Sequence, residues 1–168
     1  MTERRGYPYP LGMPAQESAQ QVETWRIHNR IHSYLLDALD EAALSAMPQP
    51  KGRSVAAQFA HVHNVRKMWL AQAAPDLDVS LLKLEGPDWT ADDLKTHLAA
   101  SGEAIAALLE RAFGQGKIKG FKPHPAAFLG YLISHESHHR GQILQTLKQN
   151  GKLPPKKVLF GLWEWGVR

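Results

Sequence analysis

Apolar positions recur at helical spacing in four long segments of the chain. The first segment, from about residue 18 to residue 44, has one apolar face that is made of Val22, Trp25, Ile31, Leu35, Leu36 and Leu39. The same period predicts further helices over about 54–74, 90–113 and 125–150. No Asn-Gly hairpin signal lies between alternating runs. The pattern therefore predicts an all-α protein, and four helices of this length favour a four-helix bundle.

Capping residues indicate where these helices begin and end. Ser54 is expected to cap the second helix, and Thr90-Ala-Asp-Asp93 resembles a capping box with Asp in place of Glu. We expect Gly114 to end the third helix and Pro125 to lie in the first turn of the fourth. The connection over about 75–89 is long for a tight hairpin, which favours a crossover along a bundle.

The two ends of the chain differ from the helical segments. Residues 1–15 contain Pro8, Pro10 and Pro14 and are expected to form an extended arm. The tail, residues 152–168, includes Val158-Leu-Phe-Gly-Leu-Trp-Glu-Trp165, which is too apolar for a free end. We therefore expect the tail to pack against the helices. A length of 168 residues predicts a single domain, 1–168.

Composition narrows the possible chemistry. The chain has no cysteine, which excludes disulfides, zinc fingers, iron–sulfur clusters and a cysteine nucleophile. Its nine histidines are therefore the main candidate metal ligands. The formal charge of +4 comes from scattered basic residues, so nucleic acid is not an expected partner. The N-terminal segment has no apolar signal core, and no apolar run reaches the length of a membrane span. We expect a cytoplasmic protein without membrane contact.

Four histidines on two predicted helices suggest a metal site. His135 and His139 are one turn apart, about 40° around the helix, so both face the apolar side and can chelate one ion. His61 and His63 are about 200° apart, so we expect His61 to face the core and His63 to be solvated. Three neutral imidazoles from two helices leave a metal with open positions, which is typical of a catalytic site.

A second pair of histidines has the same spacing. His28 and His32 lie on the first predicted helix, and they also face its apolar side. They could line a pocket, donate hydrogen bonds to the ligands or complete an alternative metal site. Spacing alone does not rank them below His135 and His139. For each inward histidine, the simpler interpretation is a core residue that donates to a backbone carbonyl.

Two motifs resemble those of a known family. The segment His135-Glu-Ser-His-His-Arg-Gly-Gln142 resembles the last-helix motif of the DinB/YfiT-like superfamily, which reads His-x-x-x-His-Arg-Gly-Gln. The segment Phe59-Ala-His-Val-His-Asn-Val-Arg-Lys-Met-Trp69 resembles the family's second-helix signature, and Leu162-Trp-Glu-Trp165 is similar to its terminal segment. With four predicted helices and a long second connection, the resemblance covers nearly the whole chain.

The resemblance implies a fold and a ligand set. The fold is a four-helix bundle in up-down-down-up order, and members are frequently homodimers. The cofactor is a divalent metal ion, often nickel, zinc or iron, and the matching ligands are His61, His135 and His139. His28 and His32 are outside this set and become pocket-lining candidates.

The resemblance also implies classes of function. Some relatives are thiol-dependent transferases that act on small molecules, and their low-molecular-weight thiol becomes a metal-bound nucleophile. Because this chain has no cysteine, such a thiol would be external. We favour this metal-dependent transferase. The alternatives are a metal-dependent hydrolase and a non-catalytic, metal-binding stress-response dimer induced by DNA damage.

Three further features of the last-helix motif lead to expectations. Glu136 and Arg140 are four residues apart, which predicts an ion pair, although Glu136 could instead support a ligand or act as a general base. Gly141 is expected to permit close helix contact. Gln142 lies about 20° from His135 around the helix and could form a hydrogen bond near the metal.

Overall fold

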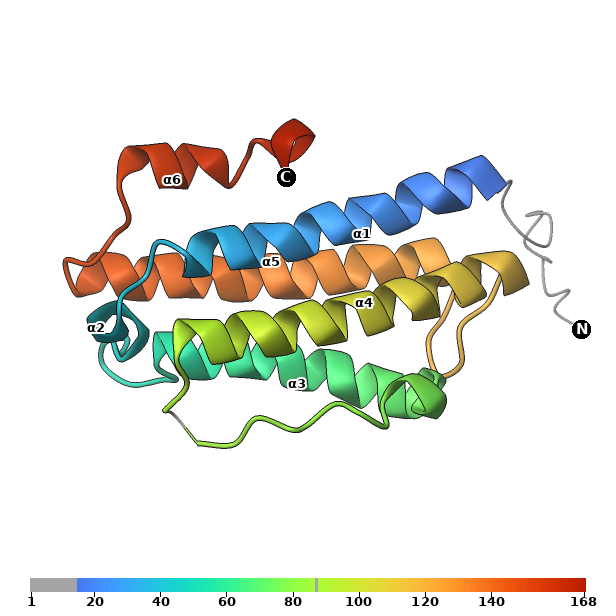
Figure 1. Ribbon diagram of the computed structural model, residues 1–168, viewed down its shortest axis with the longest axis horizontal. Coiled ribbons are helices and arrows are strands. Elements are labelled where there is room, and N and C mark those ends of the chain that lie inside the picture. The colour runs from blue at the N-terminus through green and yellow to red at the C-terminus, as the bar shows by residue number, and fades with distance from the viewer. Residues whose placement is uncertain (1–14, 87) are drawn as a thin grey trace, which may run out of the picture.

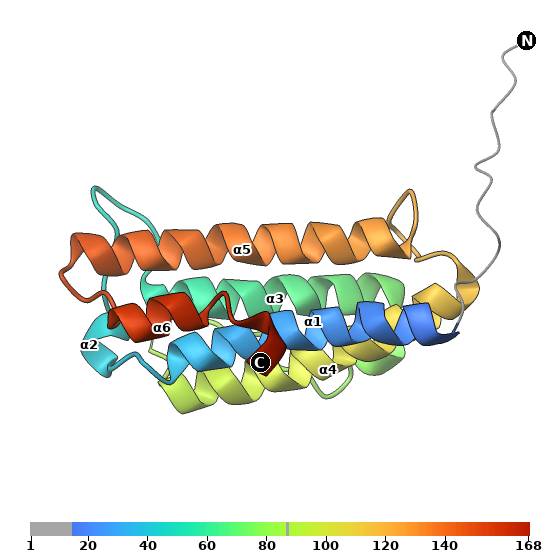
Figure 2. The ribbon, with the colours of Figure 1, turned by 90° about the horizontal axis from the view of Figure 1, so that it is seen from above.

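Four long helices lie side by side (Figure 1). The computed structural model describes residues 15–86 and 88–168, and it contains no strand over these residues. The helices are α1 (Ala15–Leu36), α2 (Glu41–Leu44), α3 (Val55–Ala73), α4 (Ala91–Gln115), α5 (Pro125–Gln149) and α6 (Lys156–Gly161), with short 3₁₀ turns at Pro75–Leu77 and Trp165–Val167. Figures 1 and 2 show that α1 and α5 run in the opposite direction to α3 and α4. The all-α prediction is confirmed. The arm predicted over residues 1–15 lies outside the described residues, except that Ala15 begins α1.

The predicted starts of three helices are confirmed. The Ser54 side chain accepts from the amide of Ala57 at 3.2 Å at the start of α3. Thr90 and Asp93 form a reciprocal capping box at the start of α4. Pro125 occupies the first turn of α5, where its missing N–H leaves no helical hydrogen bond unmade.

Two predicted helix ends are wrong. The first helix ends at Leu36 instead of residue 44, because Asp40 begins a separate short helix and accepts from the amide of Ala43 at 2.7 Å. Gly114 lies inside α4, which ends at Gln115 with Gly116 as its C-cap. Gly116 has φ of +67°, a left-handed conformation that glycine adopts without strain.

The long connection between α3 and α4 is bound along the side of α3. Asn64 donates to the carbonyl of Leu84 at 2.8 Å and accepts from the amide of the same residue at 2.9 Å. Lys67 pairs with Asp78 at 2.6 Å. These contacts cover a side of α3 that does not face the other long helices, so more than one face of α3 is buried.

The C-terminal tail packs in part. Leu162 is buried, and Trp165 packs against the same apolar cluster, as the sequence predicts. Phe160, Trp163 and Val167 are instead largely exposed.

Two apolar clusters fill the space between the long helices. One cluster includes Leu35, Phe59, Leu98 and Ile143, and the other includes Trp25, Leu70, Ile105 and Leu132. Along each helix, buried polar side chains lie between the residues of these clusters. We call this group the polar layer, and it consists of His28, Asn29, His32, Arg66, Ser101 and Glu136. Buried polar groups are costly unless they are hydrogen-bonded.

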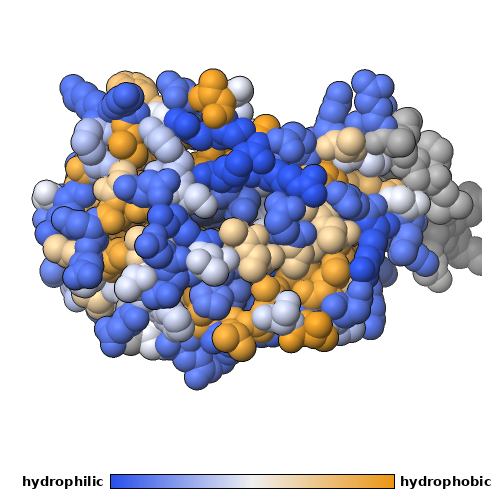
Figure 3. Space-filling view, in the orientation of Figure 1, coloured by the Kyte–Doolittle hydropathy of each residue, from blue (hydrophilic) through white to orange (hydrophobic). Residues whose placement is uncertain are grey.

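The face formed by α1, α3 and α4 has a mixed surface. Figure 3 shows hydrophilic side chains over most of this face, with apolar areas between them. In the connection between α3 and α4, Val79 and Leu82 are exposed. Among the described residues, no helix is both long and apolar enough to span a membrane.

Candidate metal centre

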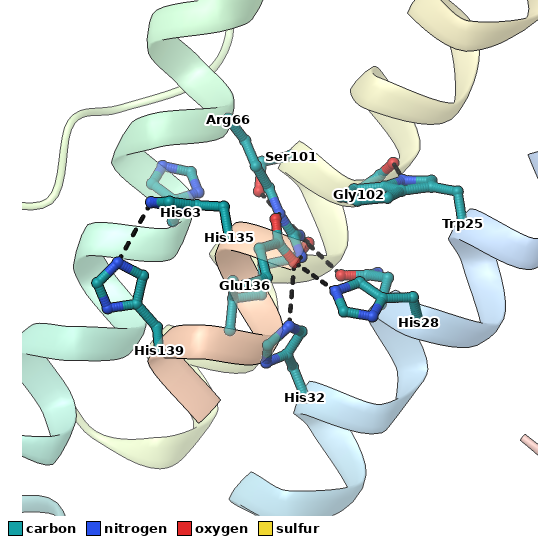
Figure 4. A network of polar contacts seen from close by, with 12 residues as sticks. Trp25, His28, His32, His63, Arg66, Ser101, Gly102, His135, Glu136 and His139 are labelled. Carbon is teal, nitrogen blue, oxygen red and sulfur yellow. Dashed lines mark hydrogen bonds and ion pairs between the residues drawn. The ribbon is translucent and has the colours of Figure 1, made fainter. Parts of the chain in front are cut away.

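Three histidines from α3 and α5 converge. His61, His135 and His139 each offer a ring nitrogen, and these three atoms lie within 4.8 Å of one another. The Nε2 atoms of His135 and His139 are 3.2 Å apart (Figure 4), and the ring centroids of His61 and His139 are 4.6 Å apart. The structure thus brings together the three histidines that the sequence analysis selected. We call them the triad.

The triad histidines are neutral near pH 7. Burial lowers the pKa of His61 and of His135 below the ordinary value. Burial, followed by repulsion from His61 and His135, lowers the pKa of His139 to about 4. Neutral imidazole is the form that binds a metal, so the electrostatics suit metal binding. His61 and His135 are half-buried, which leaves the triad accessible from solvent.

Gln142 orients one triad ring. Its Oε1 lies 3.0 Å from Nδ1 of His139, and an amide oxygen can only accept. His139 therefore carries its proton on Nδ1, and its Nε2 has a free electron pair that is directed toward the other triad rings. Such a partner is typical of histidine metal ligands. The expectation that Gln142 forms a hydrogen bond near the candidate site is confirmed.

A second group of side chains is also close enough to hold a metal ion. It consists of His28 and His32 on α1 and Glu136 on α5, and it is fully buried. Each histidine Nε2 lies 3.0 Å from Oε2 of Glu136 (Figure 4). Because an ionised carboxylate only accepts, both Nε2 atoms carry protons, and within the described residues neither Nδ1 atom has a hydrogen-bond partner.

Arg66 neutralises the buried carboxylate of Glu136. Its Nε and Nη2 donate to Oε1 and Oε2 of Glu136, both at 2.7 Å. Burial alone would raise the pKa of Glu136, but the charge and hydrogen bonds of Arg66 hold that pKa well below its ordinary value. Burial also lowers the pKa of His32 to about 3 and that of His28 in the same direction. The group is therefore an ionised carboxylate that accepts from one cation and two neutral rings.

The same guanidinium connects the four long helices. From α3, Arg66 donates through Nη1 to Oδ1 of Asn29 at 2.7 Å on α1 and to the carbonyl of Leu98 at 2.9 Å on α4. Glycine at position 102 permits this close packing of α1 and α4, because a Cβ atom there would collide with the Asn29 side chain. Trp25 also donates through Nε1 to the Gly102 carbonyl at 2.8 Å. The polar layer thus fixes the relative positions of the helices that carry the triad.

The donor chemistry of the two groups differs. A metal bound by His28, His32 and Glu136 would displace both Nε2 protons and would lie beside the charge of Arg66. Both protons would move to Nδ1 atoms that have no acceptor among the described residues, which is unfavourable in a fully buried site, whereas at the triad only His135 has such a buried Nδ1 atom. The triad has three neutral rings and is partly open, so it fits a divalent ion better.

Comparison with known proteins places the chain in a family. The sequence model of the DinB family matches residues 13–163. The chain belongs to the DinB family. A search of the curated proteins found no match. In this DinB-family chain, the matched region includes every residue of the triad and of the polar layer.

Three local expectations are wrong for this DinB-family protein. His63 is fully buried instead of solvated, with its ring nitrogens 3.0 Å and 2.8 Å from the carbonyls of His97 and Leu82. His63 is buried because α4 and the connection after α3 cover that side of the helix. Glu136 pairs with Arg66 on another helix and not with Arg140, whose Nη2 donates to Ser137 at 3.1 Å. Gly141 is not in close contact with another helix among the described residues, since a Cβ atom there would meet nothing within 4 Å.

Proposed function

We propose that this DinB-family protein is a metal-dependent enzyme whose divalent ion is held by His61, His135 and His139. The convergence of three neutral imidazole nitrogens within 4.8 Å supports this proposal most directly. Neutral ligands leave the double positive charge of the ion in place, and three protein ligands leave positions for a reactant. Imidazole suits zinc, nickel and iron.

The chain's own residues would prepare such a centre in three ways. Gln142 holds the proton of His139 on Nδ1 and leaves Nε2 free to bind. The ion pair between Arg66 and Glu136 holds α3 and α5 in a fixed relation. The partial exposure of His61 and His135 lets a small reactant approach.

Thiol-dependent group transfer is the reaction class that we propose. When bound, a divalent ion at such a centre lowers the pKa of a coordinated thiol or water and polarises a carbonyl. The chain has no cysteine, so the nucleophilic sulfur comes from an external low-molecular-weight thiol. The substrate is then a small electrophile that the thiol attacks.

Product analysis with metal-loaded protein tests this proposal. We expect zinc- or nickel-loaded protein to catalyse the reaction of a small thiol with a model electrophile such as 1-chloro-2,4-dinitrobenzene, and we expect chelation to abolish the activity. A matched His97→Ala variant alters a histidine of α4 that lies outside the triad and should remain active. Turnover of ester substrates without a thiol would favour a hydrolase. No turnover with any thiol, electrophile or ester would favour a non-catalytic metal-binding protein.

We also infer that the four long helices form an up-down-down-up bundle and that the chain acts as a homodimer. The helix directions in Figure 1 support the first inference. The exposed apolar side chains Phe160, Trp163 and Val167 of the tail support the second, because large exposed apolar groups are typical of contact surfaces. Light scattering on the eluting protein would give the mass of a dimer if the second inference holds, and that of a monomer if it does not.

A further inference from the structure

A cavity of about 650 Å³ lies between the C-terminal half of α5 and the connection that leads from α2 into α3. This volume is in the range of small-molecule binding sites. Figure 2 shows the connection running beside the end of α5. Two hydrogen bonds hold it there: the amide of Gln49 donates to Oε1 of Gln149 at 3.2 Å, and Nδ2 of Asn150 donates to the carbonyl of Met47 at 2.9 Å. The connection that forms one wall of the cavity is therefore held against α5, which forms the other wall.

The permanent charges that line this cavity are positive. Lys51 and Arg53 provide them, and the lining includes no Asp or Glu. Over the part of the chain that the structure describes, neither cation forms an ion pair. Unpaired cations around a concave, acid-free surface concentrate anions. The cavity therefore favours a negatively charged ligand.

Gln58 adds an unused hydrogen-bond acceptor. Its side chain lines the cavity and is only 5% exposed. Nε2 donates to the carbonyl of Arg53 at 3.4 Å, whereas Oε1 has no partner among the described residues. A buried acceptor without a partner is unfavourable, so a ligand with a hydroxyl or N–H group would be stabilised there.

The cavity adjoins the triad through Gln142. This side chain lines the cavity, and its Oε1 is 3.0 Å from Nδ1 of His139. The ring of His138, which also lines the cavity, has its centroid 5.4 Å from that of His139. A ligand in the cavity would therefore lie beside the candidate metal centre.

We propose that this cavity binds a small organic anion, a carboxylate or a phosphate ester, that also carries a hydroxyl or N–H group. Lys51 and Arg53 bind the anionic group, and Oε1 of Gln58 accepts a hydrogen bond from the donor group. The further statement that this ligand is a substrate rests on the proposed function. Binding itself requires no metal.

Titration of the metal-free, full-length protein tests the proposal. The probes are 3-hydroxybutyrate, its uncharged methyl ester, and butyrate, which has the charge without the hydroxyl. Glycerol 3-phosphate and glycerol form the corresponding phosphate arm. The readout is the NMR shift of the side-chain amides of Gln58, Gln142 and Gln145, at constant ionic strength and with a chelator present.

We expect saturable shifts with at least one of the two hydroxylated anions, 3-hydroxybutyrate and glycerol 3-phosphate. The anion that binds more tightly shows whether the cavity prefers a carboxylate or a phosphate ester. The uncharged counterpart should bind at least about tenfold more weakly, because it lacks the charge-assisted hydrogen bonds. Butyrate should bind roughly fivefold more weakly than 3-hydroxybutyrate, since one hydrogen bond is lost. The proposal is overturned if neither anion gives saturable shifts, or if charged and uncharged probes bind equally.

Variants test the assigned residues. Lys51→Gln with Arg53→Gln should weaken anion binding at least about tenfold, whereas the charge-matched Lys122→Gln with Lys156→Gln should leave it unchanged. In Gln58→Met, 3-hydroxybutyrate and butyrate should bind equally. If Gln58→Met does not fold, the comparison of these two probes on the wild type still decides the role of the acceptor. Equal losses in the two double variants would reject the assignment of Lys51 and Arg53.

The outcome is independent of the metal proposal. The variant His61→Ala should still bind the anion in the metal-free state, even where it no longer binds metal. Anion binding without any metal binding would leave the cavity proposal intact and would reject only the metal centre.

Discussion

Arg66 on α3 binds both carboxylate oxygens of Glu136 on α5, and both side chains are buried. Glu136 directly follows His135, and Arg66 lies in the same helix as His61. The ion pair therefore joins the two helices that carry the triad, and each partner lies within five residues of a triad histidine in its own helix. The pair thus ties α3 to α5 next to the triad.

Removing the charge of Glu136 should destabilise the protein strongly. The variant Glu136→Gln leaves the buried guanidinium of Arg66 without its counter-charge, and such a change costs about 3–5 kcal/mol of unfolding free energy. Glu103→Gln is the matched control, because Glu103 pairs with Arg26 at an exposed site, where a pair contributes about 0–1 kcal/mol. Urea denaturation of both variants measures the difference. Similar losses in the two variants would contradict the role given to Arg66.

Lower pH should destabilise the metal-free protein. Burial lowers the folded-state pKa of His28 and lowers that of His32 to about 3. Below an unfolded pKa of about 6.5, the unfolded chain takes up protons that the folded rings do not, so stability is complete above this pH and is lost as pH falls.

Each such histidine adds a slope of about 1.4 kcal/mol per pH unit. Urea denaturation with a chelator should therefore show the free energy of unfolding falling between pH 7 and pH 5. His32→Gln should reduce the slope. An unchanged slope in that variant would show that the pKa of His32 is not lowered in the folded protein.

Gln142 should contribute to metal affinity without contacting the metal. Gln142→Ala removes the acceptor that orients His139, and loss of such a partner typically weakens metal binding about 10–100-fold. Gln145→Ala changes an exposed glutamine of the same helix and should leave the affinity unchanged. Competition against a zinc indicator measures both variants. An equal affinity for the two would show that the Gln142 contact is not needed.

His63 and His61 should respond oppositely to substitution. His63→Leu removes a buried hydrogen bond to a backbone carbonyl and should cost about 1–3 kcal/mol of stability, while metal binding is retained in the folded protein. His61→Leu should abolish metal binding and change stability less, because His61 is only half-buried. Metal analysis and denaturation of the same two samples test this contrast.

The positions of the long helices could be predicted from sequence because local signals determine them. Ser54, Thr90 and Pro125 mark helix starts in the sequence, and the structure places helix starts there. The break after Leu36 was missed because the apolar period continues through it, while Asp40 supplies a stronger local cap.

The contacts between helices were harder to predict. The apolar period predicts one buried face for each helix, but α3 is covered on several sides, and this buries His63, which was expected to be solvated. Glu136 was expected to find a cation one turn away, whereas its partner Arg66 is 70 positions distant in the chain. Only the packing of α3 against α5 decides between Arg66 and Arg140.

Metal analysis of purified variants tests the central claim most directly. After loading with zinc and removal of excess metal, the wild-type protein should hold one zinc ion per chain. His61→Ala, His135→Ala and His139→Ala should each lose it while remaining folded by circular dichroism. His28→Gln, which alters the buried group around Glu136, should keep the ion. Two results would show that the metal binds elsewhere. One is stoichiometric zinc in all three triad variants, and the other is that only the folded His28→Gln variant loses its zinc.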